Sequence, residues 1–174
     1  TTADGPNRVY LSSDSGVTWS QVTGPVSGMF RSFHWFASPR PSFLIRTNTH
    51  LLRGTIANER MDELSIEVDD VLIPFDQVHA LAVSPTDDNE LIAAVNVGDR
   101  TRLLRSTDQG NHWRDTGILG EPDVSLLFSE TGAQVLAIGM QGSRWLSTDE
   151  ERMFVEDGIG PAELRCLTRG AAGV

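Results

Sequence analysis

The 174-residue chain has no lysine and very little cysteine or tyrosine. All fourteen basic side chains are arginine, so no lysine can act as a nucleophile or form a Schiff base. Cys166 is the single cysteine, which excludes a disulfide within the chain. No stretch approaches the roughly 18 consecutive apolar residues of a membrane-spanning helix. The chain starts at Thr1 without a charged-then-apolar leader, and we therefore expect a processed product, with an exported location favoured.

The sequence is also short of positive charge. With 24 acidic and 14 basic residues, the formal net charge is -10 and the pI is about 4.7. A nucleic-acid footprint needs basic surface, and so does docking to anionic lipid, so the net charge argues against both classes of partner. The four histidines and one cysteine lack structural-zinc spacing, and no calcium loop of the D-x-D-x-D-G type is present. We expect neither a metal site nor a cofactor.

What the chain does contain is an internal repeat. The motif S-x-D-x-G-x-x-W follows a short apolar stretch at Ser12 and again at Ser106. A third copy begins at Ser147, with Glu151 in place of the glycine and Phe154 in place of the tryptophan. In a fourth, almost erased copy that begins at Gly54, Asn58 and Met61 occupy those places. Starting positions of 12, 54, 106 and 147 give spacings of 42, 52 and 41 residues, close to the roughly 40–50 residues of a four-stranded propeller blade.

Short apolar runs recur in step with the motif. Residues 33–39 and 79–85 both end in Ser-Pro and lie 46 residues apart, and residues 124–129 and 163–168 occupy the next equivalent places. For one full unit we predict strands at residues 80–83, 91–97, 102–106 and 113–117, separated by turns rich in Pro, Asp, Asn and Gly. Residues 58–67 could alternatively form a short helix with Met61 and Leu64 on one face, but the register favours a hairpin.

The motif has the chemistry of a tight hairpin turn. Its aspartate can accept backbone N–H groups inside the turn, and the glycine two residues later allows positive φ. The serine hydroxyl can bond locally, and the tryptophan ring can lie over the turn and donate from its indole nitrogen. We therefore interpret the motif as a structural clip formed by Ser12, Asp14, Gly16, Trp19, Ser106, Asp108, Gly110, Trp113, Ser147, Asp149 and Phe154.

This pattern resembles the Asp-box, or BNR, repeat of sialidases, other glycoside hydrolases, sortilin-type receptors and photosystem II assembly factors. The resemblance covers nearly the whole chain and implies an all-β fold, a β-propeller of four-stranded antiparallel blades. In that family the clip lies on the outer part of a blade, away from the central binding face. We expect a half blade at residues 1–28, blades at about 29–77, 78–120 and 121–160, and a half blade at 161–174. The four repeats form either a small closed ring or part of a larger propeller.

The residues that the family's enzymes require are mostly missing. A sialidase needs a tyrosine nucleophile and an Arg-Ile-Pro run, but Tyr10, the only tyrosine, is expected to pack within a strand, and no such run exists. Paired carboxylates of a glycosidase remain an alternative, although the acidic residues fall mainly in turns and are expected to be solvated. These acidic residues are Glu67, Asp69, Asp70, Asp87, Asp88, Glu90, Glu121 and Asp123.

Candidate binding residues lie on the innermost strands and on loops. His34 and His79 are the best candidates for a ligand-facing pair, although a packed core or channel histidine is the favoured interpretation. Trp35 belongs to an aromatic cluster with Phe30, Phe33 and Phe36 that we expect to be mainly core. Arg40 and Arg100 lie on predicted loops, where propellers commonly carry binding residues. His112 is expected at the surface and Cys166 in an apolar strand.

We therefore expect a non-catalytic scaffold or binding module that engages a protein or a glycan through its loop face. A second chain or self-association is expected to complete the propeller, because an open arc leaves strand edges unpaired. The alternative is part of a glycoside hydrolase with catalytic residues mostly outside this chain. A purely structural part of a larger assembly is a third interpretation.

Overall fold

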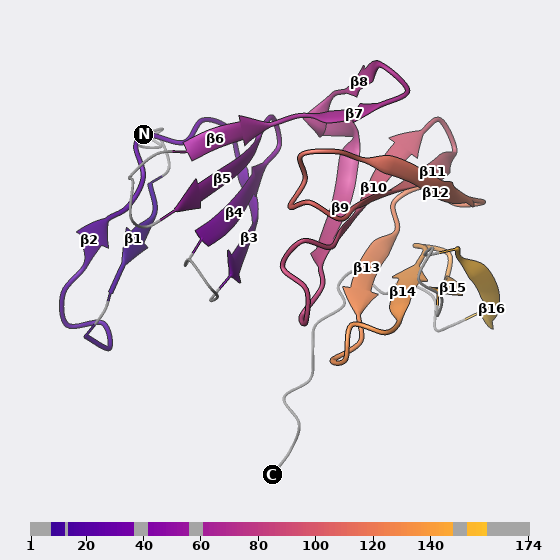
Figure 1. Ribbon diagram of the computed structural model, residues 1–174. Coiled ribbons are helices and arrows are strands. Elements are labelled where there is room, and N and C mark those ends of the chain that lie inside the picture. Colours follow the sequence, from indigo (N-terminus) through magenta and orange to yellow (C-terminus); the bar gives the residue numbers. More distant parts are fainter. Residues whose placement is uncertain (1–7, 13, 37–41, 56–60, 148–152, 160–174) are drawn as a thin grey trace, which may run out of the picture. The chain divides into compact units, whose positions relative to one another are not determined.

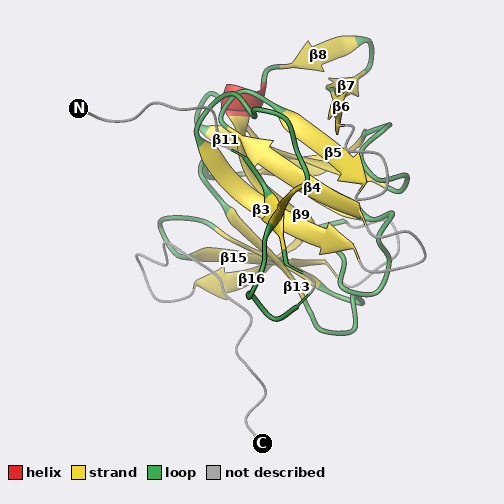
Figure 2. Cartoon of the chain, turned by 90° about the vertical axis from the view of Figure 1, so that its left-hand side faces the viewer, coloured by secondary structure: helices red, strands yellow, loops and turns green. Residues whose placement is uncertain are grey.

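The computed structural model describes residues 8–12, 14–36, 42–55, 61–147 and 153–159. Strands dominate these residues, and their one helix is a three-residue 3-10 helix, η1 (Phe75–Gln77), drawn in red in Figure 2. In the described part, no helix has the length and apolar character needed to cross a membrane. The chain divides into two compact units, Thr1–Ser65 and Ile66–Val174.

Unit 1 contains a hairpin and a four-stranded antiparallel sheet. The hairpin pairs β1 (Tyr10–Leu11) with β2 (Ser20–Gln21). The sheet runs in chain order through β3 (Phe30–Phe36), β4 (Ser42–Thr47), β5 (Leu51–Thr55) and β6 (Met61–Leu64) (Figure 1). Residues 61–64 are therefore a strand, as the hairpin interpretation requires, and the helical alternative is wrong for them.

The core of unit 1 joins the hairpin to one face of the sheet. Val22 and Val26, which follow the hairpin, pack with Phe43 and Ile45 of β4. Partly buried residues extend this cluster: Val9, Leu11, Leu52 and Met61. Phe43 and Ile45 are two residues apart on β4, so their side chains point to the same face of the sheet, and this face is the one that the hairpin covers.

Unit 2 contains a small hairpin and two four-stranded sheets. The hairpin pairs β7 (Ile66–Val68) with β8 (Val71–Ile73) through Asp69 and Asp70, both at positive φ. The first sheet runs through β9 (Val78–Val83), β10 (Leu91–Val97), β11 (Arg100–Ser106) and β12 (Arg114–Leu119). The second runs through β13 (Ser125–Phe128), β14 (Val135–Ile138), β15 (Ser143–Ser147) and β16 (Val155–Ile159), and Figure 1 shows both.

The two sheets of unit 2 share their core. Ala94, Leu103 and Leu119 of the first sheet pack with Val124, Ala137 and Trp145. A second cluster joins Ala82 and Ile92 to Phe128 and Val135. Residues 91–95 of β10 are at most 1% exposed, because this strand is covered on both faces. A near-continuous apolar strand without alternation is the sequence pattern that such burial requires.

The same irregularity recurs in both sheets of unit 2. On β12 the register shifts at Thr116, between the pairs Leu103↔Gly117 and Leu104↔Asp115. On β16 it shifts at Asp157, between Arg144↔Gly158 and Trp145↔Glu156. Thr116 and Asp157 are 41 residues apart, the spacing of the motif copies at Ser106 and Ser147, so the two sheets repeat each other in detail.

Three groups of residues differ from what the sequence predicts. Of the aromatic cluster expected in the core, only Phe36 is buried (3% exposed), whereas the others remain 39–47% exposed: Phe30, Phe33 and Trp35. Tyr10 lies on β1 as predicted but is 48% exposed, because β1 pairs with β2 alone in the described part of the chain. Two acidic residues expected in solvated turns, Glu90 and Glu121, are buried, and their hydrogen bonds are described below.

Candidate functional site

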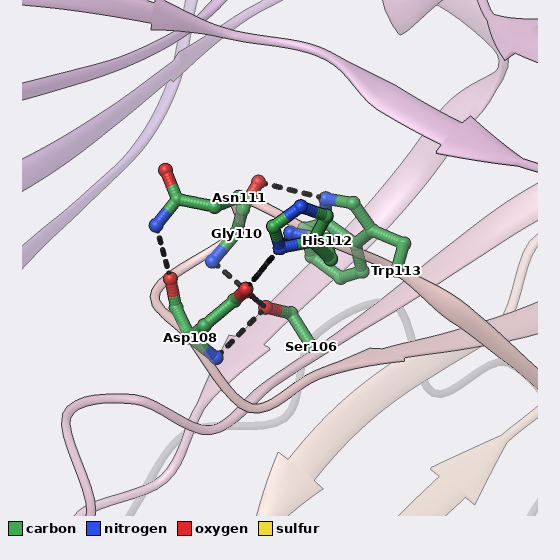
Figure 3. Close-up of polar contacts among 6 residues, drawn as sticks. All are labelled: Ser106, Asp108, Gly110, Asn111, His112 and Trp113. Carbon is green, nitrogen blue, oxygen red and sulfur yellow. Dashed lines mark hydrogen bonds and ion pairs between the residues drawn. The ribbon is translucent and has the colours of Figure 1, made fainter.

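The motif at Ser106 forms a closed hydrogen-bonded turn (Figure 3). The Ser106 hydroxyl donates to Asp108 Oδ1 over 2.9 Å and accepts from the Gly110 N–H over 2.8 Å. Asp108 Oδ1 also accepts from the His112 N–H over 2.9 Å, and the Trp113 indole donates to the Gly110 carbonyl over 3.0 Å. Gly110 has φ +87°, which explains the glycine. The polar groups of the motif thus form their hydrogen bonds with one another, within the turn.

The motif at Ser12 repeats this turn bond for bond. Ser12 donates to Asp14 over 2.8 Å and accepts from the Gly16 N–H over 2.7 Å, while Trp19 donates to the Gly16 carbonyl over 3.1 Å. Thr18 takes the place of His112, since its N–H and its hydroxyl both donate to Asp14, over 2.8 and 2.6 Å.

Hydrogen bonding lowers the pKa of both motif aspartates. For Asp14, the Thr18 hydroxyl, the Thr18 N–H and the Ser12 hydroxyl lower the pKa to about 2. Burial raises the pKa of Asp108, but the hydrogen bonds from His112 and Ser106 outweigh it and leave the pKa below its ordinary value. These carboxylates are thus held ionised by the turn itself and are poorly suited to act as general acids.

Only parts of the third and fourth copies of the motif lie among the described residues. Ser147 is fully buried at the end of β15, and Phe154 packs against the core clusters that the two sheets of unit 2 share. Asp149 lies outside the described residues, as do Asn58 of the fourth copy and Cys166.

The other end of unit 2 carries a different set of polar residues. Its turns and connections, residues 97–100, 120–124 and 139–142, meet at one end of both sheets, opposite the Ser106 turn; we call this the loop end. The register between β9 and β10 shifts at His79, which makes His79 a bulged residue. Bulges re-aim side chains and are frequent beside functional sites.

The His79 ring is held by a carboxylate from the connection between the two sheets. His79 Nδ1 lies 3.1 Å from Asp123 Oδ1, with side chains 41% and 37% exposed. Asn96 fixes Asp123 twice, because its amide donates to Oδ1 over 2.5 Å and its carbonyl oxygen accepts from the Asp123 N–H over 3.2 Å. Asp123 itself has φ +55°. The bulged residue His79 is therefore paired with Asp123, a residue in the left-handed region, and the pair lies at the loop end.

A buried carboxylate, that of Glu121, accepts hydrogen bonds from the turn between β14 and β15 at the loop end. Glu121 is 9% exposed and accepts from the Gln141 N–H over 3.1 Å and from the Ser143 hydroxyl. Its acceptors are therefore satisfied by the turn between β14 and β15. Glu90, at the opposite end, accepts from Arg105 Nε over 2.9 Å. Both residues are structural acids in this geometry.

Two large apolar side chains stand exposed at the loop end. Val97 is 53% exposed at the end of β10, and Met140 is 51% exposed in the turn after β14. Arg100 is exposed at the start of β11. The loop end thus combines apolar, basic and imidazole groups on turns that are themselves tied down by hydrogen bonds.

The remaining sequence candidates lie in unit 1. Trp35 is 43% exposed on β3, and Arg40 lies outside the described residues. Burial, and then the charge of Arg46, lower the pKa of His34, whose Nε2 is buried without a hydrogen-bond partner among the described residues. The predicted pair His34 and His79 therefore belongs to two different units, and only His79 is held by a carboxylate.

Sequence reasoning missed Asn96 and the role of Asp123 altogether. The residues are 27 positions apart, and no local motif connects them. The described residues contain no cluster of three or more His, Cys, Asp or Glu side chains that could hold a metal ion. His112 lies at the surface, with its side chain 89% exposed, and its Nδ1 is 2.5 Å from Asp108 Oδ2.

Comparisons with known proteins identify the fold. No family model and no curated protein sequence matches the chain. Among solved structures, YCF48 bound to D1 peptide matches with a TM-score of 0.59 at 17% identity, covering 88% of this chain and 47% of that one. The GH74 enzyme of Niastella koreensis matches more weakly, with a TM-score of 0.40 at 15% identity over 90% of this chain and 30% of that one. The chain thus spans about half of the first structure's length and less of the second's.

The four-stranded antiparallel sheets and the likeness to YCF48 define the class of protein. The chain is an all-β protein with the β-propeller fold.

Proposed function

We propose that this chain is a non-catalytic β-propeller module that binds a protein or glycan partner through the loop end of unit 2. The observation that carries the proposal is the fixed pair His79–Asp123, held by Asn96 at the same end of the unit as the exposed side chains of Val97 and Met140. Rigid turns with half-exposed apolar and polar groups lose little entropy on binding. The D1 peptide bound to YCF48 supports a peptide as the first class of partner to test.

The proposal includes the type of repeat and its division into blades. The two hydrogen-bonded turns have the residues and the contacts expected of Asp-boxes, and we assign the chain to that repeat type. Blades at about 29–77, 78–120 and 121–160 follow the three four-stranded sheets, with half blades at 1–28 and 161–174 completed by a second chain or by self-association. Asp-box turns at the end of the sheet opposite the loop end leave the loop end available to a partner.

The test is binding of the whole chain to immobilised peptide and glycan arrays. The variants Val97→Ser and Met140→Ser should weaken binding by about tenfold, since each removes apolar area at the contact. Val155→Ser is the matched control, because Val155 is 70% exposed at the start of β16, at the opposite end of the unit. Equal binding by all three variants at unchanged melting temperature contradicts the proposal.

A second assay addresses the glycosidase alternative. We expect no turnover of aryl glycosides or sialosides, because four carboxylates are engaged in hydrogen bonds within the fold: Asp14, Asp108, Glu90 and Glu121. Turnover that persists through purification and disappears on substitution of a single carboxylate would replace the binding function by a catalytic one.

A further inference from the structure

One face of the sheet in unit 1 is only partly covered. Phe33 and Trp35 of β3 stand directly across from Ile45 and Phe43 of β4, and the rings of Phe33 and Phe43 stack with centroids 5.8 Å apart. The hairpin β1–β2 and the segment that follows it pack on Phe43 and Ile45, which are 1% and 0% exposed, whereas Phe33 and Trp35 remain 39% and 43% exposed. The aromatic surface of the sheet thus continues past the hairpin and ends uncovered.

The hairpin presents an open strand edge in the same unit. In the described part of the chain, β1 pairs with β2 alone. The Val9 carbonyl accepts from the Val22 N–H over 2.9 Å, so Val9 faces the partner strand. Because successive residues of a strand direct their backbone polar groups to alternate edges, those of Tyr10 face the open edge. Its side chain is 48% exposed.

Unit 2 shows what fills the equivalent place. Alignment of Ser12 with Ser106 makes Tyr10 equivalent to Leu104 and Trp19 equivalent to Trp113. Strand β11, the equivalent of β1, pairs with β12 on one edge and with β10 on the other. Leu104 is 0% exposed and Trp113 is 7% exposed, against 48% and 61% for Tyr10 and Trp19. The turn is the same in both places, so the difference in burial reflects neighbouring strands that unit 2 has and that the described residues of unit 1 lack.

The strands that fill this place carry small and aliphatic side chains. From β9 and β10, Ala80, Ala82, Ile92 and Ala94 pack against the core that the next sheet shares. The second strand of each sheet contains at least four consecutive residues that are neither charged nor glycine, as in residues 42–45, 91–97 and 135–138. No such run occurs in the parts of the chain outside the described residues: 1–7, 13, 37–41, 56–60, 148–152 and 160–174.

We propose that the open edge of β1 and the aromatic surface of Phe33 and Trp35 accept an extended strand of small aliphatic side chains that comes from outside these 174 residues. The strand adds antiparallel to β1, as β10 adds to β11, and lays its apolar side chains on the two rings. This inference deepens the part of the proposed function in which a second chain completes the propeller, and it is independent of the loop end.

The test uses a labelled peptide with the sequence of residues 91–97, flanked by arginines for solubility, and fluorescence anisotropy with the whole chain. We expect saturable binding, weakened at least tenfold in the double variant Phe33→Ser, Trp35→Ser. Trp35→Phe keeps an aromatic surface and should retain binding, which separates loss of the surface from loss of the fold. The same peptide N-methylated at every residue has no N–H group to donate along either of its edges and should not bind. Equal binding of the methylated peptide, or binding unaffected by the double variant, overturns the proposal.

A second measurement asks whether the place is already filled. Replacing Cys166 by serine removes the single natural cysteine, and the added substitution Tyr10→Cys then supplies one thiol on β1. The rate at which this thiol reacts with a maleimide should fall when the peptide is added. Slow reaction without peptide that does not depend on protein concentration means that the chain fills the edge itself, which overturns the proposal. Protection that grows with concentration supports it, with a second copy as the donor. The loop-end variants Val97→Ser and Met140→Ser should bind the peptide normally, so failure of the two proposals can be told apart.

Discussion

At the scale of single residues, the carboxylates of the two turns do structural work. Asp108 and Asp14 each accept several hydrogen bonds from within four residues of chain, and each supports a glycine at positive φ. A carboxylate that organises three donors cannot be removed without leaving some of those donors unsatisfied.

Replacement of Asp108 by alanine should therefore destabilise the fold. The Ser106 hydroxyl and the His112 N–H lose their acceptor, and we expect a loss of about 1–3 kcal/mol in the free energy of unfolding. Chemical denaturation measures this loss. Asp14→Ala is the matched comparison, because the same bonds lie in an exposed turn there, and its effect should be smaller. An equal or larger effect of Asp14→Ala would show that burial does not set the strength of the turn.

The low pKa of Asp14 makes a separate prediction about pH. With a pKa of about 2 in the fold, against about 3.9 in an unfolded chain, the ionised form is favoured by folding. The contribution of Asp14 to stability is complete above pH 4 and is lost as the pH falls towards 2. NMR titration of the carboxyl should give a midpoint near 2. Thr18→Val should raise this midpoint, because valine lacks the hydroxyl that donates to Asp14 and stabilises the ionised carboxylate. A midpoint near 3.9 would mean that the turn is open in solution.

At the scale of elements, packing between neighbouring strands fixes which residues are tolerated. Gly54 of β5 stands directly opposite Phe43 of β4, and the phenylalanine ring lies where a β-carbon on Gly54 would be. The Phe43 ring therefore occupies the space that a side chain at position 54 would need.

Gly54→Ala should consequently destabilise unit 1. The added methyl group overlaps the buried Phe43 ring, and we expect a cost of about 1–3 kcal/mol from overpacking. Gly24→Ala is the control, because no atom lies within 4 Å of its added β-carbon. Thermal unfolding followed by circular dichroism compares the two variants. Equal melting temperatures for both would show that the β4–β5 pair adjusts freely.

The elements of the repeat were largely predictable from local pattern. The strand predicted at residues 91–97 is β10, and the strand predicted at 102–106 forms most of β11. Turn residues set these limits, because glycine, proline and aspartate act over a few positions. The bulge at His79 was not predictable, since it depends on the register between β9 and β10 and on nothing within β9 itself.

At the scale of the whole molecule, burial differs sharply from one strand to another. Leu91–Val95 are at most 1% exposed in β10, whereas Tyr10, Val17 and Trp19 of the β1–β2 hairpin are 48–80% exposed. Local stability follows such differences in cover.

Hydrogen exchange should reflect this gradient. Amides of β10 and β11 should be among the slowest to exchange, because both strands have neighbours on both edges. Amides of β1 and β2 should exchange fastest among the strands, and the strand peptide proposed above should slow β1 selectively. Mass spectrometry of exchanged fragments resolves the two regions. Protection of β1 equal to that of β11 without any added strand would contradict the description of an open edge.

The amino-acid sequence by itself determined the turn chemistry, the repeat and the all-β class, because a serine, an aspartate, a glycine and a tryptophan within eight residues can satisfy one another without help from elsewhere. Only the tertiary structure decided which copy is covered and which side chains meet. Trp19 and Trp113 make the same bond in the same turn, yet one is exposed and the other buried. Likewise, His79 finds Asp123 from 44 positions away (123 − 79) because two sheets pack together. Contacts between distant residues depend on packing of the whole chain, and no local pattern encodes them.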